Sequence, residues 1–171
     1  MNNIKLHLNI FQDWKANRGY FKGRLVLLCF RFAVLVRSNI ILTIIFCWYL
    51  LFYRLIIEWI MGIELSWNLS AGKGLMLFHG QALIVNGYTV IGENCTLRHS
   101  TTIGIKGELN DKFTSPIIGN NVNIGAHVCI LGNIKIGDNV KIGAGSIVTK
   151  DIPSNCVVVG NPACIIKNFN V

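Results

Sequence analysis

Nine large apolar residues recur at intervals of six along the second half of this 171-residue chain. An α-helix repeats every 3.6 residues and a β-strand every two, so a period of six fits neither as one continuous element. A short strand followed by a tight corner, repeated, does direct one large side chain inward in each unit. The nine residues are Ile91, Leu97, Ile103, Ile118, Ile124, Ile130, Ile136, Ile142 and Val148.

Three such units close a triangular coil of about eighteen residues, and stacked coils make a parallel β-helix. Asparagines fall near the expected corners, and Asn tolerates left-handed backbone angles better than most residues. The pattern therefore predicts a mainly β fold with corners near Asn94, Asn121, Asn133 and Asn139.

The ladder is irregular in two places. Extended backward from Ile91 it reaches Val85 and then His79, a poor residue for an inward position, whereas a shift of two residues restores Leu77. Fifteen residues also separate Ile103 from Ile118, so nine extra residues form a loop at about 105–116. Irregular points in a repeat are where function tends to lie, and we expect both to line one site.

The amino-terminal part is basic and apolar. Residues 1–57 carry eight Lys or Arg against the single acid Asp13, out of a net charge of +8 for the whole chain. We predict helices at about 4–17, 22–37 and 39–61. The chain then divides into an α-helical subdomain, residues 1–62, and a β-helix domain, residues 63–171.

This helical part has two interpretations. Its longest uncharged stretch, Ser38–Tyr53, has sixteen residues, and a membrane-spanning helix needs about twenty. Residues 20–61 either pack against their own copies in an oligomer or lie in the membrane interface, with the side chains of Arg24, Arg31, Arg37 and Arg54 reaching the headgroups. Nucleic-acid binding is disfavoured because the basic residues alternate with aliphatic ones.

The six cysteines show neither a C-x-x-C pair nor the spacing of a metal site. We interpret them as buried free thiols in a reducing compartment, which favours a cytoplasmic protein. If residues 20–61 lie in the membrane interface, the protein would be peripheral at the inner face of the cell membrane.

The chain resembles the serine acetyltransferase-like group of hexapeptide-repeat acyltransferases, and within it the acetyltransferases of colanic acid and capsule synthesis. The resemblance implies a left-handed parallel β-helix that assembles as a homotrimer. It rests on the stretches Asp13–Asn17, Gly62–Glu64, Leu77–Gly80, Thr96–Gly104, Ile130–Ile134, Ile142–Ser146 and Val159–Ala163.

The resemblance also implies an acetyl-CoA-dependent O-acetyltransferase with His79 as general base and Glu64 as the carboxylate that orients it. The chemistry agrees, because a neutral imidazole near pH 7 can take the proton of an attacking hydroxyl. A carboxylate on the other ring nitrogen holds the tautomer and stabilises the imidazolium. The group usually carries Asp at the position of Glu64.

Two departures from the group bear on the acceptor. Phe78 stands where serine acetyltransferases carry an acid, and Thr114–Ser115 stand where they carry Arg-His. Without those partners the ammonium and carboxylate of serine would be left unpaired. We therefore predict a saccharide acceptor in exopolysaccharide or capsule biosynthesis, such as a lipid-linked repeat unit, with Phe78, His99 and Ser115 as its contacts. The alternatives are a serine O-acetyltransferase of cysteine biosynthesis and a non-enzymatic membrane-associated scaffold.

By the same resemblance, acetyl-CoA would lie in a groove between two β-helices of the trimer. Lys141, with Lys150 or Lys167, would meet its phosphates as point charges. The backbone contacts would come from Gly104, Ala126, Gly143 and Ala144. No metal is expected, because the three-histidine zinc site of γ-type carbonic anhydrases needs two histidines five residues apart, and His79, His99 and His127 are twenty and twenty-eight residues apart.

Overall fold

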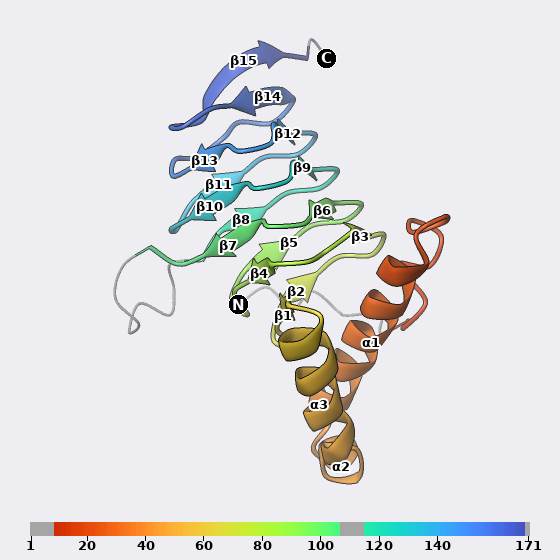
Figure 1. The fold of residues 1–171 in the computed structure, drawn as a ribbon. Helices are drawn as coiled ribbons and strands as arrows, with labels where there is room; N and C mark the ends of the chain where they lie inside the picture. The colour runs from red at the N-terminus through yellow and green to blue at the C-terminus, as the bar shows by residue number, and fades with distance from the viewer. Residues whose placement is uncertain (1–8, 107–114, 170–171) are drawn as a thin grey trace.

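The structure, a computed structural model, describes residues 9–106 and 115–169 and shows a parallel β-helix with a group of helices at its amino-terminal end (Figure 1). The helices are α1 Phe21–Arg37, α2 Ile40–Ile45, α3 Cys47–Tyr53 and the π-helix η1 Arg54–Ile60. The strands are β1 Ile63–Leu65, β2 Ser70–Ala71, β3 Met76–Phe78, β4 Leu83–Val85, β5 Val90–Ile91, β6 Thr96–Arg98, β7 Thr102–Gly104, β8 Ile117–Ile118, β9 Asn123–Ile124, β10 Cys129–Leu131, β11 Lys135–Ile136, β12 Lys141–Ile142, β13 Ile147–Val148, β14 Cys156–Val159 and β15 Cys164–Asn168.

The strands form the three walls of the β-helix, and each coil up to β12 contributes one strand to each wall. Sheet 1 has the order β1-β4-β7-β10-β13, sheet 2 the order β2-β5-β8-β11, and sheet 3 the order β3-β6-β9-β12-β14-β15. The last coil supplies β13 and β14, and in sheet 2 it makes only an isolated bridge between Ile152 and Ile136. All pairs are parallel except β14 with β15, which closes the carboxyl-terminal end as an antiparallel pair. The predicted parallel β-helix with helices before it is confirmed.

Strand register confirms both irregularities of the repeat. Regular coils have eighteen residues, as in the pairing of Cys129 with Ile147. Ile63 pairs with Leu83, twenty residues later, which accounts for the two extra residues at His79. Thr102 pairs with Cys129, twenty-seven residues later, so the loop adds nine residues. Most of that loop, Thr114 included, falls outside the described residues.

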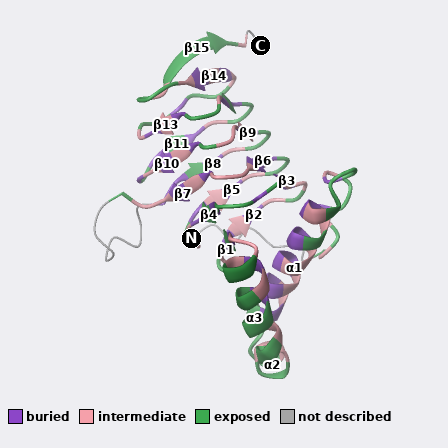
Figure 2. Ribbon diagram, in the orientation of Figure 1, coloured by how far each residue is buried: buried purple, intermediate pink, exposed green. Residues whose placement is uncertain are grey.

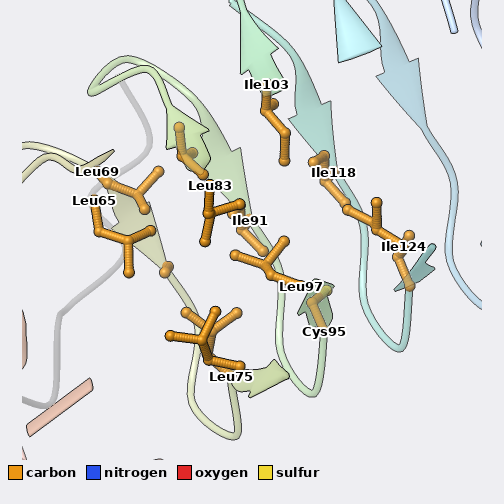
Figure 3. Packing of buried hydrophobic residues seen from close by; sticks show 14 of the residues in the cluster. Leu65, Leu69, Leu75, Leu83, Ile91, Cys95, Leu97, Ile103, Ile118 and Ile124 are labelled. Carbon is orange, nitrogen blue, oxygen red and sulfur yellow. The ribbon is translucent and has the colours of Figure 1, made fainter. Parts of the chain in front are cut away.

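The interior of the coils is filled by the ladder of apolar residues, and all nine of its members are buried. Figure 3 shows these side chains in the interior, with Leu97 beside Ile91 in one coil and Ile118 and Ile124 in the next, where Ile118 pairs with Ile91. The corners follow the prediction at Asn94, Asn121 and Asn139, which have φ of 56° to 58°. Asn133 is an exception, because the preceding Gly132 takes the left-handed conformation there, with φ of 101°.

The helices differ in part from the prediction. Helix α1 matches the expected helix at 22–37, but the single helix expected at 39–61 is broken into three segments at Phe46 and Tyr53. The side chain of Asn39 caps α2 by accepting a hydrogen bond from the Ile41 backbone N–H at 2.8 Å. Residues 10–19 form successive turns rather than the helix expected at 4–17, and residues 1–8 are not described. The division of the chain into two folding units at residue 62 stays a prediction.

Two polar side chains of the turn segment satisfy the free edge of β3, the first strand of sheet 3. Asp13 Oδ1 accepts the Leu75 N–H at 2.9 Å. Asn17 donates to Leu75 O at 2.8 Å and accepts the Leu77 N–H at 2.9 Å. An edge strand otherwise presents unpaired backbone groups. The segment therefore replaces a neighbouring strand and holds the stretch that leads to His79.

Arg31 anchors this arrangement from α1. Its Nε lies 2.7 Å from Asp13 Oδ2, and its other nitrogens donate to Ala71 O at 2.7 Å and Gly72 O at 2.6 Å. The prediction that Arg31 reaches out toward headgroups is wrong, because its side chain is only 2% exposed. A guanidinium can be buried when its donors meet a carboxylate and backbone carbonyls, as they do here.

All six cysteines are free thiols. Cys95 and Cys156 are buried as expected, but Cys47 and Cys164 are exposed, so the general prediction of buried thiols is wrong for those two. Within the described ranges, none of the helices combines the length and the apolar character needed to cross a bilayer.

Candidate active site

Three histidines line the corner between sheet 3 and sheet 1, which we call the histidine corner. His79 follows β3, His99 follows β6 and His127 lies between β9 and β10. The ring centroids of His79 and His99 are 5.9 Å apart, and those of His99 and His127 are 5.3 Å apart, both edge to face. Residues far apart in the sequence are thus brought together because each coil turns the same corner.

His79 lies where the coil is distorted. Its φ is +66°, and Gly80 and Ala82 also have positive φ values, of 74° and 52°. A left-handed conformation costs a non-glycine residue roughly 1–2 kcal/mol, so the surrounding coil must hold it in place. His79 is an exposed residue, and its ring lies beside that of His99.

His99 is the half-buried member of the row. Its Nδ1 is buried and has no hydrogen-bond partner among the described residues. A buried lone pair without a donor costs less than a buried N–H without an acceptor. The proton of a neutral His99 therefore belongs on Nε2, which leaves that nitrogen as a donor toward a bound molecule.

Phe78 is covered from two sides. The Tyr20 ring lies 4.2 Å from it, edge to face, and the Arg98 guanidinium lies 5.2 Å from its centroid. Arg98 is held by hydrogen bonds to Asn123 Oδ1 at 2.5 Å and Ile124 O at 2.7 Å. At the position where the resemblance places an acid, the structure therefore has the Phe78 ring with the Arg98 guanidinium over it. Arg98 and Tyr20 were missed in the sequence; the position of Arg98 directly before His99 was a signal, and Tyr20 had none.

Glu64 is the exposed central residue of β1 in sheet 1. Burial raises the pKa of the nearby Glu58, Arg54 lowers it, and the charge of Glu64 adds to the rise. Between Glu64 and His79 the described residues show no hydrogen bond. The role of Glu64 as orienting carboxylate therefore stays a prediction.

Ser115 lies at the carboxyl-terminal end of the strands of sheet 1, and the histidine corner lies at their amino-terminal end. It is buried and donates a hydrogen bond to Asn86 Oδ1 at 3.1 Å, just after β4. His79 precedes β4, and this three-residue strand spans roughly 10 Å. A single chain thus does not bring His79 and Ser115 into one site.

The residues expected to bind acetyl-CoA lie on the later coils. A Cβ at Gly104 would meet nothing within 4 Å, so the backbone there faces open space. Gly143 donates to Val158 O and accepts from Ser146 Oγ, and the Ala126 carbonyl accepts from Gly145, so these groups already serve the β-helix. The Ala144 backbone lies against Gly125 of the preceding coil, where an added Cβ would come 2.5 Å from the Ala144 nitrogen.

Two of the candidate lysines meet on the outer face of sheet 3. The ammonium nitrogens of Lys141 and Lys167 lie 5.2 Å and 5.9 Å from the centroid of the Phe169 ring. Lys150 is exposed and lies apart, after β13, beside a cavity of about 140 Å³ that Pro162 also lines. The structure thus groups Lys141 with Lys167. No cluster of His, Cys, Asp or Glu among residues 9–106 and 115–169 could hold a metal ion.

Comparison with known proteins identifies the family. Residues 115–150 match the family described as Bacterial transferase hexapeptide (six repeats). Over 158 residues the chain is 35% identical to WcaB of Escherichia coli (strain K12), which is named as a colanic acid biosynthesis acetyltransferase; the match covers 90% of this chain and 96% of WcaB.

Serine acetyltransferases are also similar. The enzyme of Synechococcus elongatus is 38% identical over 110 residues, which cover 64% of this chain but 45% of that protein. The crystal structure of serine acetyltransferase in complex with coenzyme A from Brucella abortus strain S19 matches with a TM-score of 0.77 and 29% identity, over 95% of this chain and 66% of that one. The chain spans less than half of the Synechococcus protein and nearly all of WcaB. It belongs to the hexapeptide-repeat acyltransferases, in the group that contains the serine acetyltransferases and WcaB.

Proposed function

We propose that this protein transfers an acetyl group from acetyl-CoA to a hydroxyl of a saccharide in exopolysaccharide or capsule biosynthesis. The observation that carries the proposal is the replacement of an acidic side chain before His79 by Phe78, which lies between Tyr20 and Arg98. An amino-acid acceptor finds no carboxylate for its ammonium there. A neutral sugar needs none.

His79 is the general base in this proposal. One nitrogen of its ring takes the proton of the acceptor hydroxyl as the oxygen attacks the thioester carbonyl. When the C–S bond breaks, the imidazolium gives this proton to the departing sulfur, so that coenzyme A leaves as the thiol and the base is regenerated. Glu64 would orient the ring and stabilise the imidazolium. His99, half-buried beside His79, would donate a hydrogen bond to the acceptor.

The acetyl donor would lie along the outer face of the later coils. Lys141 and Lys167 would attract its phosphates, and the backbone of Ala126 and Ala144 would meet the pantetheine arm. The coenzyme A complex of the Brucella relative supports this choice of donor.

A homotrimer would complete the site. His79 and Ser115 lie at opposite ends of the strands of sheet 1, so a pocket that contains both needs the edge of a second copy. Three β-helices packed side by side would supply such a pocket at each of three interfaces.

We also propose that the enzyme acts at the inner face of the cell membrane, where lipid-linked saccharides are available.

Serine O-acetylation is the second candidate. It is supported by the names of the Synechococcus and Brucella relatives, as the polysaccharide function is by that of WcaB. The two functions differ in the charges that the site must pair. L-serine brings an ammonium and a carboxylate, and neither Phe78 nor Ser115 carries a charge that could pair with them.

The test is a comparison of kcat/KM for L-serine and for a panel of saccharides, with the reaction measured by the release of the coenzyme A thiol. We expect the best saccharide to exceed L-serine by about 10³-fold or more, because unpaired charges in a partly closed site are rejected strongly. Comparable values would favour the serine acetyltransferase.

His79→Ala should lower the rate of transfer at least about 10²-fold and leave the affinity for acetyl-CoA nearly unchanged. His127→Ala is the matched control, since His127 is also exposed with a positive φ of 57°. Equal losses in the two variants would contradict the assignment of the base.

A further inference from the structure

The helices carry a large exposed apolar surface at the point farthest from the β-helix. Helix α1 and the α3–η1 segment run side by side away from the coils, and α2 joins them at the far end (Figure 1). Figure 2 shows α2 and much of α3 as exposed. We call six of these residues the apolar tip: Ile40, Ile41, Ile44, Ile45, Trp48 and Leu51, which are 56–72% exposed.

The apolar tip is also without charge. No charged residue occurs between Ser38 and Tyr53, and a contiguous apolar patch of this kind normally marks a contact with a partner or a membrane. The surface continues along η1, where Trp59 and Ile60 are 75% and 69% exposed.

The charges beside the tip are positive. The two acids of residues 9–62 are already paired, Asp13 with the buried Arg31 and Glu58 with Arg54 at 3.3 Å. Arg37 is exposed beside the tip and has no acid of this segment left to neutralise it, whereas Lys15 and Arg18 precede α1 and lie at its other end. Arg37 ends α1 next to the tip.

This combination favours an anionic lipid surface over a second copy of the chain. A two-fold contact places a patch against itself, so the tip would meet another tip with Arg37 facing Arg37. A bilayer interface suits each kind of side chain at the tip. Apolar side chains enter the acyl boundary, Trp lies at headgroup level, and basic side chains contact anionic headgroups.

We propose that the apolar tip inserts into the interface of an anionic lipid bilayer, with Arg37 at the headgroups. Amphipathic surfaces of this kind enter by roughly 5–10 Å, which suits a protruding tip rather than a spanning helix. In the homotrimer proposed above, three tips would face one membrane and bind it together. The inference rests on the membrane position proposed above and names the surface that makes the contact; it holds whichever hydroxyl accepts the acetyl group.

The test is co-sedimentation of the full chain with vesicles of phosphatidylglycerol and phosphatidylcholine, and with vesicles of phosphatidylcholine alone. Wild type should bind the anionic vesicles more tightly. Ile41→Asn/Ile44→Asn should weaken that binding about tenfold or more, because two exposed apolar side chains no longer enter the lipid. Arg37→Gln should weaken it about fivefold, as expected for one basic residue near anionic lipid.

The matched control is Ile165→Asn/Ile166→Asn on β15, at the other end of the molecule (Figure 1). These residues are 44% and 63% exposed, and their replacement should leave vesicle binding unchanged. His79→Ala should bind vesicles as wild type does, so a failure of the catalytic assignment leaves this test intact.

Three outcomes would overturn the proposal. Wild type could fail to bind anionic vesicles, or the tip and control variants could bind equally well. Sedimentation velocity could also show that the tip variant dissociates a larger assembly without any vesicle binding, which would make the tip an interface between copies.

Discussion

The buried pair of Asp13 and Arg31 should be the most sensitive point of the fold outside the coils. Both side chains are almost fully buried, at 3% and 2% exposed, with Nε and Oδ2 2.7 Å apart. Asp13→Asn keeps an oxygen for the Leu75 N–H but leaves the guanidinium without a counter-charge. Removing one partner of a buried pair costs about 3–5 kcal/mol, because the other charge stays in a low-dielectric site.

That cost can be measured by denaturant or thermal unfolding at one fixed protein concentration, since assembly would also add to stability. For a chain of this length each kcal/mol shifts Tm by about 2–4 °C, so Asp13→Asn should lower it by roughly 6–20 °C. The control is Glu93→Gln, which breaks the exposed pair with Lys73 at 3.5 Å and should cost less than about 1 kcal/mol.

Asp13→Asn/Arg31→Gln removes both charges and keeps hydrogen-bonding groups at both positions. It should be less destabilised than Asp13→Asn alone, because no buried charge is left without a partner. The reasoning is refuted if Asp13→Asn costs no more than Glu93→Gln, or if the double variant is the least stable of the three.

Two further predictions concern the segments that flank the proposed site. Asn17→Ala leaves the Leu75 carbonyl and the Leu77 N–H, at and just before β3, without their side-chain partner, at about 1–3 kcal/mol each. It should lower kcat more than it changes KM, because β3 leads directly to His79. A stable variant with unchanged kcat would show that β3 keeps its place unaided. Lys141→Ala should raise KM for acetyl-CoA about two- to fivefold at constant kcat, as for one exposed charge contact, whereas Lys135→Ala on sheet 2 should not; equal effects would remove Lys141 from the donor site.

The coils of this protein could be predicted from the sequence because each unit must bury one residue. A ladder of apolar residues at a spacing of six is a local property of the chain, and every member of it is buried in the structure. The two breaks in the ladder were visible for the same reason, and strand register places extra residues at both. The positive φ values of Asn94, Asn121 and Asn139 also followed from the chemistry of single residues.

The helical part was less predictable because its pattern is apolar on nearly every side. A continuous apolar run does not reveal where Asn39 caps one helix or where Phe46 ends it. Nor does it show which face is covered, so the exposed isoleucines of α2 and the buried Val26 and Leu27 of α1 look alike in the sequence.

By itself, the sequence determined the repeat and its two breaks, since both depend on local spacing, and its resemblance to known acetyltransferases indicated the family. Tertiary structure alone decided the contacts that join distant positions: Arg31 with Asp13, Arg98 and Tyr20 with Phe78, and the three histidines in one row. The physical reason is that a buried charge or a stacked ring acquires its partner only when the coils and helices pack, and that partner has no fixed distance along the chain.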